Sequence, residues 1–359
     1  MLLTIAIPTF ERQSDLCALL ASIAREFAKD DSISSVIEVV VCDNASKDET
    51  SEVCSQFFGS IKNLRYQKNS TNLGFSRNFV ECIRAASGDY VWPIGDDETI
   101  EPDSLRKIIE LISANQYDIL IFNYSMEPEP SGTPALKSVF GSEIYLGDIK
   151  LIDFVREHGW LWTLGNLGMV SVNRRKLLKV DPEEYLFSNF AQSAWYLAAF
   201  RDSTTCFINL AVYRTFIKSQ TVNKERWKSD GTWIQMKTLV ELLGLLISKG
   251  VVSQTVPIKF LNGCSMDRQP IWNYLFEHLI EGLKRNEIDI EKDWFDRSIY
   301  LINLLDDQEL RLRLTSKVTK IFSSLSVAQH AKRLYVDRLG ALIEDINENF
   351  PALRFGTRD

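Results

Sequence analysis

"DYVWPIGDDETI", residues 89–100, is the stretch that decides the fold. An apolar run typical of a buried strand ends abruptly at three consecutive acids, Asp96, Asp97 and Glu98. Adjacent carboxylates repel one another, so a fold that holds them together gains something by it, and a bound cation is the usual reason. The stretch therefore predicts a buried strand whose carboxyl end carries a charged site.

Strand and helix patterns alternate on both sides of this stretch. Such alternation with short connections predicts an α/β fold, a mostly parallel sheet with helices on both faces. In sheets of this kind ligands bind at the carboxyl ends of the strands, which here carry Asp43 and the acidic run. Gly88 is expected to close the third helix. Strands are expected at 2–10, 36–46, 63–69, 90–95, 117–125 and 204–216, and helices at 13–28, 48–58, 74–87 and 102–116.

Composition narrows the class of protein. The chain has 359 residues, of which 45% are hydrophobic and 25% charged, as in globular proteins. A net charge of -7 argues against broad nucleic-acid binding. Six scattered cysteines without a CxxC pair indicate reduced thiols and a cytoplasmic protein, and no apolar run reaches about 18 residues. Neither GxGxxG nor GxxxxGK[ST] occurs, which disfavours nicotinamide dehydrogenases and P-loop enzymes.

Three segments together resemble a known family. They are "IAIPTFERQSDLCALLASI" (5–23), "VVVCDNASKDET" (39–50) and "NLGFSRNFVECIRAASGDYVWPIGDDE" (72–98). Their order and spacing resemble the nucleotide-sugar domain of family 2 glycosyltransferases, which has the GT-A fold, over about residues 1–125. The "GDDE" ending is most similar to the abequosyltransferase-like branch of O-antigen and capsule enzymes.

The resemblance implies a donor site for a nucleoside-diphosphate sugar. Asp43 would accept a hydrogen bond from a uracil or thymine imide, which favours UDP- or dTDP-sugars; an Asx turn is the alternative role. The turn after the first strand would cradle the base, unless it is only a strand-to-helix turn. Asn72 and Arg77 would favour the anionic nucleotide, unless they are solvated helix residues. The donor residues implied are Pro8, Thr9, Glu11, Arg12, Asp43, Asn72, Arg77 and Asp96.

The same resemblance answers why the acids are adjacent. Asp97 stands where the family has its metal-binding Asp, so Mn2+ or Mg2+ would bind there and contact both donor phosphates. The ion would neutralise charge on the departing nucleoside diphosphate. Asp96 would contact the ribose, or the metal through water. Gly95 stands where many relatives carry the first Asp of a DxD. The plain alternative is an acidic helix N-terminus before Pro102.

The catalytic base is the gap in this pattern. Inversion at the anomeric carbon needs a group that takes the acceptor hydroxyl's proton. The family's base position falls near residues 189–195, which contain no carboxylate, and Gln192 cannot act as a base. Glu184 ranks first and His158 second as substitutes, although structural roles are commoner for both. Trp160 and Trp162 would stack on the acceptor sugar or be buried.

Periodicity changes after residue 224. Helices are expected at 232–250, 269–286, 296–307, 308–325 and 326–346. We therefore expect a GT-A domain at 1–224 for donor and acceptor, and a helical region at 225–359 that packs on it or assembles a homo-oligomer. In 311–322 basic residues surround an apolar face, so peripheral contact with an anionic membrane stays open, although a core-facing helix is commoner.

The expected function is that of an inverting, metal-dependent glycosyltransferase. It would move a sugar from a nucleoside diphosphate to a bacterial surface glycan or a lipid-linked acceptor, in the cytoplasm or at the inner face of the membrane. One alternative is a degenerate transferase that binds nucleotide or glycan without turnover, because the expected base is missing. The other is a sugar nucleotidyltransferase, which usually begins with a Gly-rich phosphate loop that "IPTFERQ" lacks.

Overall fold

The structure, a computed structural model, describes residues 1–114, 117–128, 149–217, 231–262 and 288–327. The chain divides into two compact units. Unit 1 comprises Met1–Leu151 and Leu164–Arg226, and unit 2 comprises Ile152–Thr163 and Trp227–Asp359. The division after residue 226 lies beside the domain boundary expected at 224, and a short earlier segment joins unit 2. The expected helix at 269–286 and most of the one at 326–346 lie outside the described residues.

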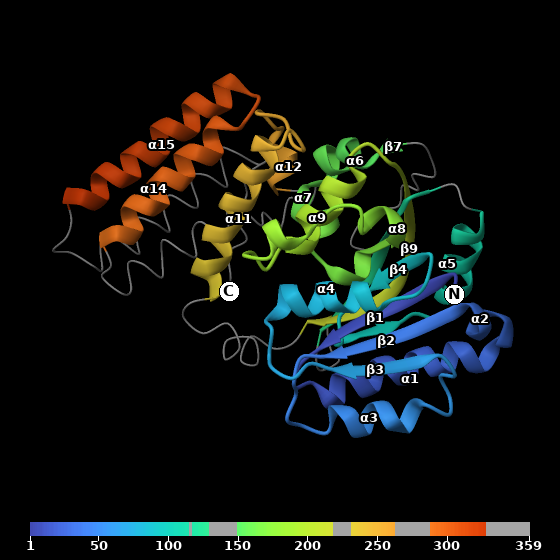
Figure 1. The fold of residues 1–359 in the computed structure, drawn as a ribbon. Coiled ribbons are helices and arrows are strands. Elements are labelled where there is room, and N and C mark those ends of the chain that lie inside the picture. The colour runs from blue at the N-terminus through green and yellow to red at the C-terminus, as the bar shows by residue number, and fades with distance from the viewer. Residues whose placement is uncertain (115–116, 129–148, 218–230, 263–287, 328–359) are drawn as a thin grey trace. The chain divides into compact units, whose positions relative to one another are not determined.

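Unit 1 is built on one mixed sheet, whose first half is parallel. In the order β3-β2-β1-β4, the strands are β3 (Leu64–Lys68), β2 (Ile37–Asp43), β1 (Leu3–Thr9) and β4 (Tyr90–Pro93). Every residue of β1 and β2 is buried, as expected for parallel strands covered on both faces. The expected α/β plan is therefore confirmed (Figure 1).

The second half of the sheet mixes directions, which the sequence did not indicate. β8 (Val170–Asn173) is antiparallel to both β4 and β6 (Ile119–Pro128). β9 (Thr204–Ile217) runs parallel to β6, with a register irregularity at Asn123. Two short strands, β5 (Glu98–Ile100) and β7 (Ile149–Lys150), pair antiparallel with β9. The strand β5 was not expected, and it means that Glu98 opens a strand directly after the acidic pair.

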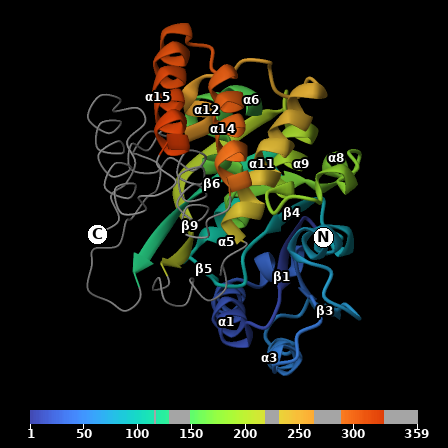
Figure 2. The same ribbon diagram turned by 90° about the vertical axis from the view of Figure 1, so that its left-hand side faces the viewer.

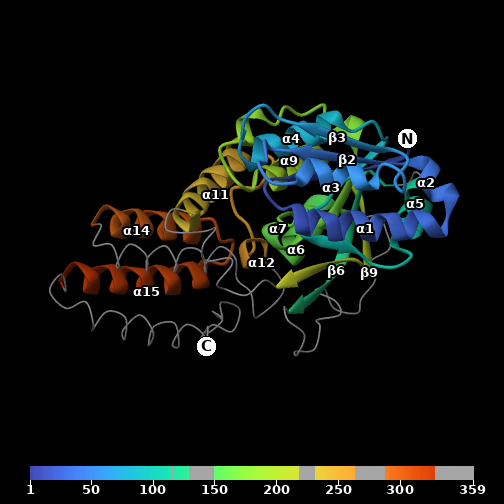
Figure 3. The same cartoon turned by 90° about the horizontal axis from the view of Figure 1, so that it is seen from below.

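Helices cover both faces of the parallel half. α1 (Gln13–Lys29) and α3 (Thr50–Phe57) lie on one face and α4 (Phe75–Ala85) on the other (Figures 1 and 3). Phe79 of α4 meets the rings of Trp195 and Tyr196 edge-on, each at 6.3 Å between centroids. α4 is thereby packed between the sheet and α9. Other helical elements of unit 1 are α2 (Asp31–Val36), α5 (Ser104–Ser113), η1 (Leu167–Met169), α8 (Arg174–Leu177), η2 (Glu183–Tyr185) and α9 (Ala191–Phe200).

Gly88 does not close α4, contrary to expectation. The helix ends at Ala85, and its C-cap residue Ala86 is already extended. A Cβ on Gly88 would lie 2.7 Å from the backbone nitrogen of Thr4 and from the carbonyl oxygen of Tyr90. Glycine is therefore needed here because two backbones approach closely, not because a helix stops.

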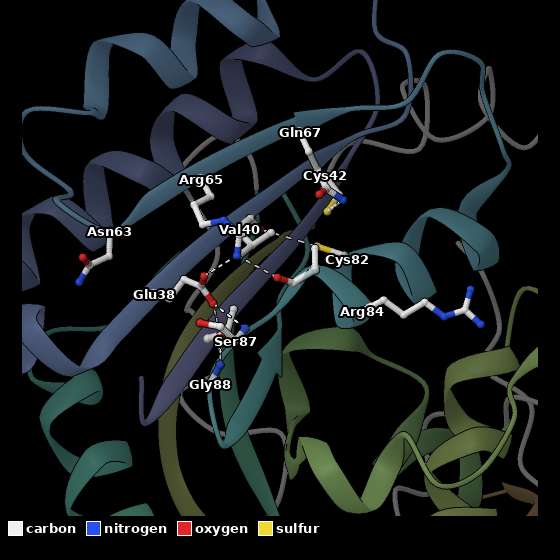
Figure 4. Close-up of polar contacts among 12 residues, drawn as sticks. Glu38, Val40, Cys42, Asn63, Arg65, Gln67, Cys82, Arg84, Ser87 and Gly88 are labelled. Carbon is white, nitrogen blue, oxygen red and sulfur yellow. Dashed lines mark hydrogen bonds and ion pairs between the residues drawn. The ribbon is translucent and has the colours of Figure 1, made fainter.

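A buried carboxylate stabilises the amino-terminal edge of the sheet. Glu38, in β2, is 3% exposed and accepts hydrogen bonds from Thr4 Oγ1 (2.6 Å), Arg65 Nη1 (2.7 Å) and the backbone nitrogen of Ser87 (2.8 Å) (Figure 4). Burial alone would raise the pKa of Glu38. The bonds from Thr4 and Arg65 outweigh it, and the pKa is lowered. Glu38 therefore joins β1, β3 and the segment before β4 as a charged group.

The described residues of unit 2 are mostly helical, as expected for the C-terminal region. α14 (Ile288–Asn303) and α15 (Gln308–Val327) lie side by side (Figure 3). Leu314 and Val318 of α15 are buried, so the core-facing alternative holds for these two residues. No helix in the described ranges is both long and apolar enough to cross a membrane. The other helices are α6 (Leu151–His158), α7 (Trp160–Leu164), α11 (Gly231–Ser248) and α12 (Ile258–Asn262).

Trp160 takes the buried role, not an exposed one. It is fully buried and stacks on Phe260 within unit 2, with ring centroids 6.0 Å apart and planes inclined by 18°. Stacking on an acceptor sugar, the other role considered for Trp160, would require an accessible ring face. The side chain of Trp162 lies outside the described residues.

Candidate active site

Hydrogen bonds connect the loops after β1 and β2 at the carboxyl edge of the sheet. Asn44 N donates to Thr9 O at 2.9 Å, and Glu11 N donates to Ser46 Oγ at 2.8 Å. Gln13 N then donates to an oxygen of Asp48 at 3.1 Å. These three hydrogen bonds connect the two loops along the edge of the sheet.

Each of these loops holds a residue in the left-handed region. Glu11 has φ 50° and Ala45 has φ 68°, and neither is glycine. Such conformations cost about 1–3 kcal/mol each and persist where the surrounding structure enforces them, often at ligand sites. The expectation that Glu11 belongs to a donor-binding turn stays a prediction, and its backbone is the strained point of that turn.

The acidic pair lies beside the end of β1 and is bridged by an arginine. Thr9 Oγ1 donates to Asp96 Oδ2 at 2.8 Å. A single atom, Arg12 Nη1, lies 2.8 Å from Asp96 Oδ1 and 2.8 Å from Asp97 Oδ2. Three residues predicted for the donor site and the residue predicted for the metal are therefore in direct contact.

Burial sets the electrostatics of this cluster. Desolvation raises the pKa of Asp96 to about 6; Arg12 opposes the rise and Asp97 adds to it. Burial also acts on Arg12 and would lower its pKa, but the charges of Asp96 and Asp97 outweigh burial and raise it. Asp96 is the less accessible carboxylate, with its side chain 7% exposed against 30% for Asp97. The open side of the pair is therefore Asp97.

Gly95 makes room for Asp97. Glu98 N donates to Gly95 O at 3.2 Å, so residues 95–98 form a tight turn between β4 and β5. A Cβ on Gly95 would lie 3.0 Å from Asp97 Oδ1, closer than most real contacts. The glycine found where many relatives carry an acid thus fits the conformation that brings Asp96 and Asp97 together.

Asp43 is fully buried and already bonded within the protein. Its Oδ1 accepts from Ser46 N at 2.8 Å, and its Oδ2 accepts from Tyr66 Oη at 2.6 Å, with Lys68 Nζ 3.9 Å away. The turn role considered for Asp43 is therefore present. A role at the donor's base is not tested by this geometry, and each carboxylate oxygen has a second lone pair for it.

An amide network organises the loop after β3. Asn44 Nδ2 donates to Asn72 Oδ1 at 2.8 Å, and Asn44 Oδ1 accepts from Leu73 N at 2.8 Å. Asn69 Nδ2 donates to Asn78 Oδ1 at 2.8 Å and to Asn44 Oδ1 at 3.2 Å. Asn72 therefore holds the loop in place. The sequence places Asn69 at the carboxyl edge of the sheet but gave it no individual role, although the density of asparagines in "KNSTNLGFSRN" was a signal.

Arg77 bonds to an acid of a different segment. Its guanidinium lies 3.0 and 3.3 Å from the two oxygens of Glu183, in η2, and Ser76 Oγ donates to Ser188 O at 2.8 Å. These contacts fasten the η2 segment to the start of α4. Glu184 bonds to the neighbouring Tyr185, whose pKa is raised by burial and by that bond.

Two residues remain from the question of the catalytic base, His158 and Gln192. His158 belongs to unit 2, where its ring centroid is 4.4 Å from that of Phe154 and burial lowers its pKa. Gln192, in the first turn of α9, donates to Gly165 O at 3.0 Å. Its Oε1 is buried and has no hydrogen-bond partner among the described residues. The roles predicted for Glu184 and His158 are not tested by these contacts.

The described side chains do not supply a full set of metal ligands by themselves. Among the described residues, no three His, Cys, Asp or Glu side chains converge as metal ligands. Asp96 and Asp97 nevertheless converge on one cationic atom, the Nη1 of Arg12, which marks where a cation is stabilised. Two adjacent carboxylates suit a hard divalent cation that takes its other ligands from a substrate and water.

Comparison with known proteins relates residues 4–166 to a known family. The model of glycosyl transferase family 2 matches residues 4–166. The abequosyltransferase RfbV of Salmonella typhimurium is 28% identical over 228 residues, 63% of this chain and 54% of that protein. The poly(ribitol-phosphate) beta-N-acetylglucosaminyltransferase TarS of Staphylococcus aureus is 26% identical over 124 residues, 34% of this chain and 20% of that protein. The chain thus matches about half the length of the first relative and less of the second.

Solved structures share the fold. S. aureus TarS 1–349 in complex with UDP-GlcNAc superposes with a TM-score of 0.62 at 15% identity, covering 97% of this chain and 92% of that chain. Another crystal structure of S. aureus TarS 1–349 gives a TM-score of 0.58 with the same coverage. At this identity the likeness speaks for the GT-A-like architecture alone.

Proposed function

Residues 4–166 are a glycosyl transferase family 2 domain, and from that premise we propose that this chain is an inverting, metal-dependent glycosyltransferase. The donor proposed is a nucleoside-diphosphate sugar, with UDP or dTDP as the nucleotide. The observation that carries the proposal is the pair Asp96 and Asp97, which converges on one cationic position at the carboxyl edge of the sheet. The loop after β1, which is hydrogen-bonded to the loop after β2, contacts this pair through Arg12.

The donor nucleotide is proposed to bind across the ends of β1, β2 and β4. Asp43 lies at the end of β2 in register with Thr9 at the end of β1, so a base near one is near the other. A carboxylate is the acceptor that a uracil or thymine imide needs. UDP-GlcNAc bound to the TarS neighbour is consistent with a UDP-sugar as the first donor to test.

Asp97 is proposed to hold a Mn2+ or Mg2+ ion, with Asp96 supporting it from the buried side. A divalent ion bound there with the diphosphate would supply charge neutralisation as the leaving group departs. Thr9 fixes Asp96 through the bond to Oδ2, so Asp96 keeps its orientation whatever occupies Oδ1. Gly95 leaves the turn free of a side chain that would crowd Asp97.

The acceptor is proposed to be a bacterial surface glycan or a lipid-linked precursor. The names of the abequosyltransferase and of the poly(ribitol-phosphate) enzyme associate similar sequences with sugar transfer, and the latter with a polymer. Glu184 is the proposed base. Arg77 and Ser76 fasten its segment to the start of α4. Before α4 comes the loop after β3, which Asn44 holds from the end of β2.

A second function, binding without turnover, is favoured by one observation. The start of α9 presents Gln192 and no carboxylate, and Gln192 cannot remove a proton. A chain of this kind would bind nucleotide and metal yet fail to transfer sugar.

Donor turnover separates the two functions. We expect the protein to hydrolyse or transfer from UDP-GlcNAc or another UDP- or dTDP-sugar when Mn2+ is present, and excess EDTA to abolish the activity. Asp97→Asn should remove metal-stimulated donor binding in calorimetry. Asp89→Asn is the matched control, because Asp89 is an exposed carboxylate paired with Arg175 at the start of β4. Full activity in excess chelator would refute the metal assignment, and metal-dependent binding without turnover on any donor would favour the second function.

A further inference from the structure

One cation already occupies the acidic pair. Arg12 Nη1 lies at 2.8 Å from both Asp96 Oδ1 and Asp97 Oδ2, a distance typical of charge-assisted hydrogen bonds. Because the two carboxylates are neighbours in the chain, they would repel each other without such a charge between them. The oxygens that a divalent cation would use are therefore the oxygens that the guanidinium uses.

The position of Arg12 is not explained by its helix. Arg12 is the N-cap residue of α1, where the helix dipole is positive, and its side chain makes no capping bond there. A cation at this end of a helix is disfavoured, whereas an anion is favoured. The carboxylates thus account for the location of the guanidinium, and an incoming anion would find a favourable place beside it.

The exposure of Arg12 allows its guanidinium to move away from the acidic pair. Its side chain is 25% exposed, and Asp97, on the open side of the pair, is 30% exposed. Asp96 does not depend on Arg12 for its position, since Thr9 holds its other oxygen. A guanidinium released from the pair has a geometry that matches phosphate oxygens, with two parallel donors.

We propose that Arg12 is the specificity-determining residue of this cation site. It occupies Asp96 and Asp97 in the nucleotide-free protein, withholds them from free divalent cations, and yields them when a nucleoside diphosphate arrives with its cation and offers phosphate oxygens to the guanidinium. This inference rests on the proposed function, because it assumes that the pair receives a nucleotide-bound metal. Its consequence is that nucleotide and metal bind as one unit, while metal alone binds weakly.

The test measures Mn2+ binding without turnover. Free Mn2+ is followed by electron paramagnetic resonance during titration of the full chain, alone and with saturating UDP. For Arg12→Met we expect about tenfold tighter Mn2+ binding in the absence of UDP, because the oxygens are no longer occupied. UDP binding at saturating Mn2+ should weaken by a similar factor, since the phosphates lose the guanidinium. Arg12→Lys, which keeps the charge, should stay close to wild type in the first measurement.

Two controls make the result decisive. Arg175→Met removes another exposed arginine paired with an acid, Asp89, and should change neither affinity. Arg12→Gln serves as a second variant if Arg12→Met does not fold, as judged by circular dichroism. The inference is overturned if the wild type binds Mn2+ with UDP but the Arg12 variants bind free Mn2+ no more tightly than the wild type. If the wild type binds no Mn2+ even with UDP, the metal-dependent function itself fails.

Discussion

Glu38→Gln tests what holds the parallel half of the sheet together. The change is nearly isosteric and removes only the charge and one acceptor oxygen. Glu38 Oε2 accepts from both Thr4 and Ser87, and Oε1 accepts from Arg65. A glutamine must place its amide nitrogen at one of these two positions, so it faces a donor whichever way it turns.

The cost follows from the bonds that cannot be kept. If the glutamine oxygen serves Thr4 and Ser87, the charge-assisted bond from Arg65 is lost and a buried amide donor faces the guanidinium. A hydrogen bond to a charged group contributes about 1.5–3 kcal/mol, and an unsatisfied buried donor adds to the loss. We therefore expect the free energy of unfolding to fall by about 2–4 kcal/mol, measured by urea unfolding followed through tryptophan fluorescence.

The pH dependence has a definite sign. The pKa of Glu38 is lower in the folded protein than its ordinary value, so its stabilisation is present above the unfolded pKa and is lost as pH falls through the folded pKa. The difference between wild type and Glu38→Gln should therefore narrow as the pH falls below about 4.

Glu81→Gln is the control for this experiment. Glu81 forms an exposed pair with Arg84 at 2.9 Å, and such pairs contribute at most about 1 kcal/mol. A Glu38→Gln loss below 1 kcal/mol, or a difference that widens at low pH, would refute the reasoning.

Three further predictions concern the candidate site. Asp43→Ala should weaken UDP or dTDP binding by about 1–3 kcal/mol in calorimetry, the cost of an unpaired buried partner, and unchanged affinity would leave Asp43 as a turn residue only. Glu184→Gln should lower turnover about 100-fold or more at saturating substrates while donor affinity stays the same; His158→Ala is the second choice, and near-normal turnover in both variants would exclude both as the base. The pKa of Asp96 is raised to about 6 in the folded protein, so ionisation of Asp96 lowers the stability of the folded state as pH rises towards and through that value. In metal-free protein, the melting temperature of Asp96→Asn minus that of wild type should therefore be larger at pH 7.5 than at pH 4.5. A difference that does not depend on pH would contradict the raised pKa.

Local signals in the sequence were enough for the parallel half of the sheet. The helix expected at 13–28 is Gln13–Lys29, and the strand expected at 90–95 is Tyr90–Pro93. These elements follow from runs of apolar residues with a regular period, which depend on neighbours close in the chain. The placement of polar residues at the carboxyl edge followed from the same pattern, because parallel strands end on one side.

Contacts between distant segments were not accessible in this way. β5 exists because Glu98–Ile100 pairs with a stretch of β9 that starts at Tyr213, and nothing in three residues signals that partner. The role of Arg12 was equally hidden. It was expected to contact a nucleotide, and only the fold brings its guanidinium to Asp96 and Asp97, more than eighty positions later in the chain.

The turn that carries the acidic pair is also a short tether across the sheet. In strand order β4 and β5 are separated by β8, β6 and β9, which in a flat sheet would put them about 19 Å apart. The chain from Pro93 to Glu98 spans at most about 18 Å when fully extended, and the bond from Glu98 to Gly95 shortens it. The sheet therefore has to curl until its far edge comes back toward the middle.

Two features allow the β6–β9 pair (Figure 2) to bend in this way. One is the register irregularity at Asn123, and the other is the short pairing of β8 with β6. Straightening the β6–β9 pair would stretch the segment from Pro93 to Glu98. That segment carries the carboxylates of Asp96 and Asp97. The position of the two carboxylates therefore depends on the curvature of the sheet as well as on the bonds from Thr9 and Arg12.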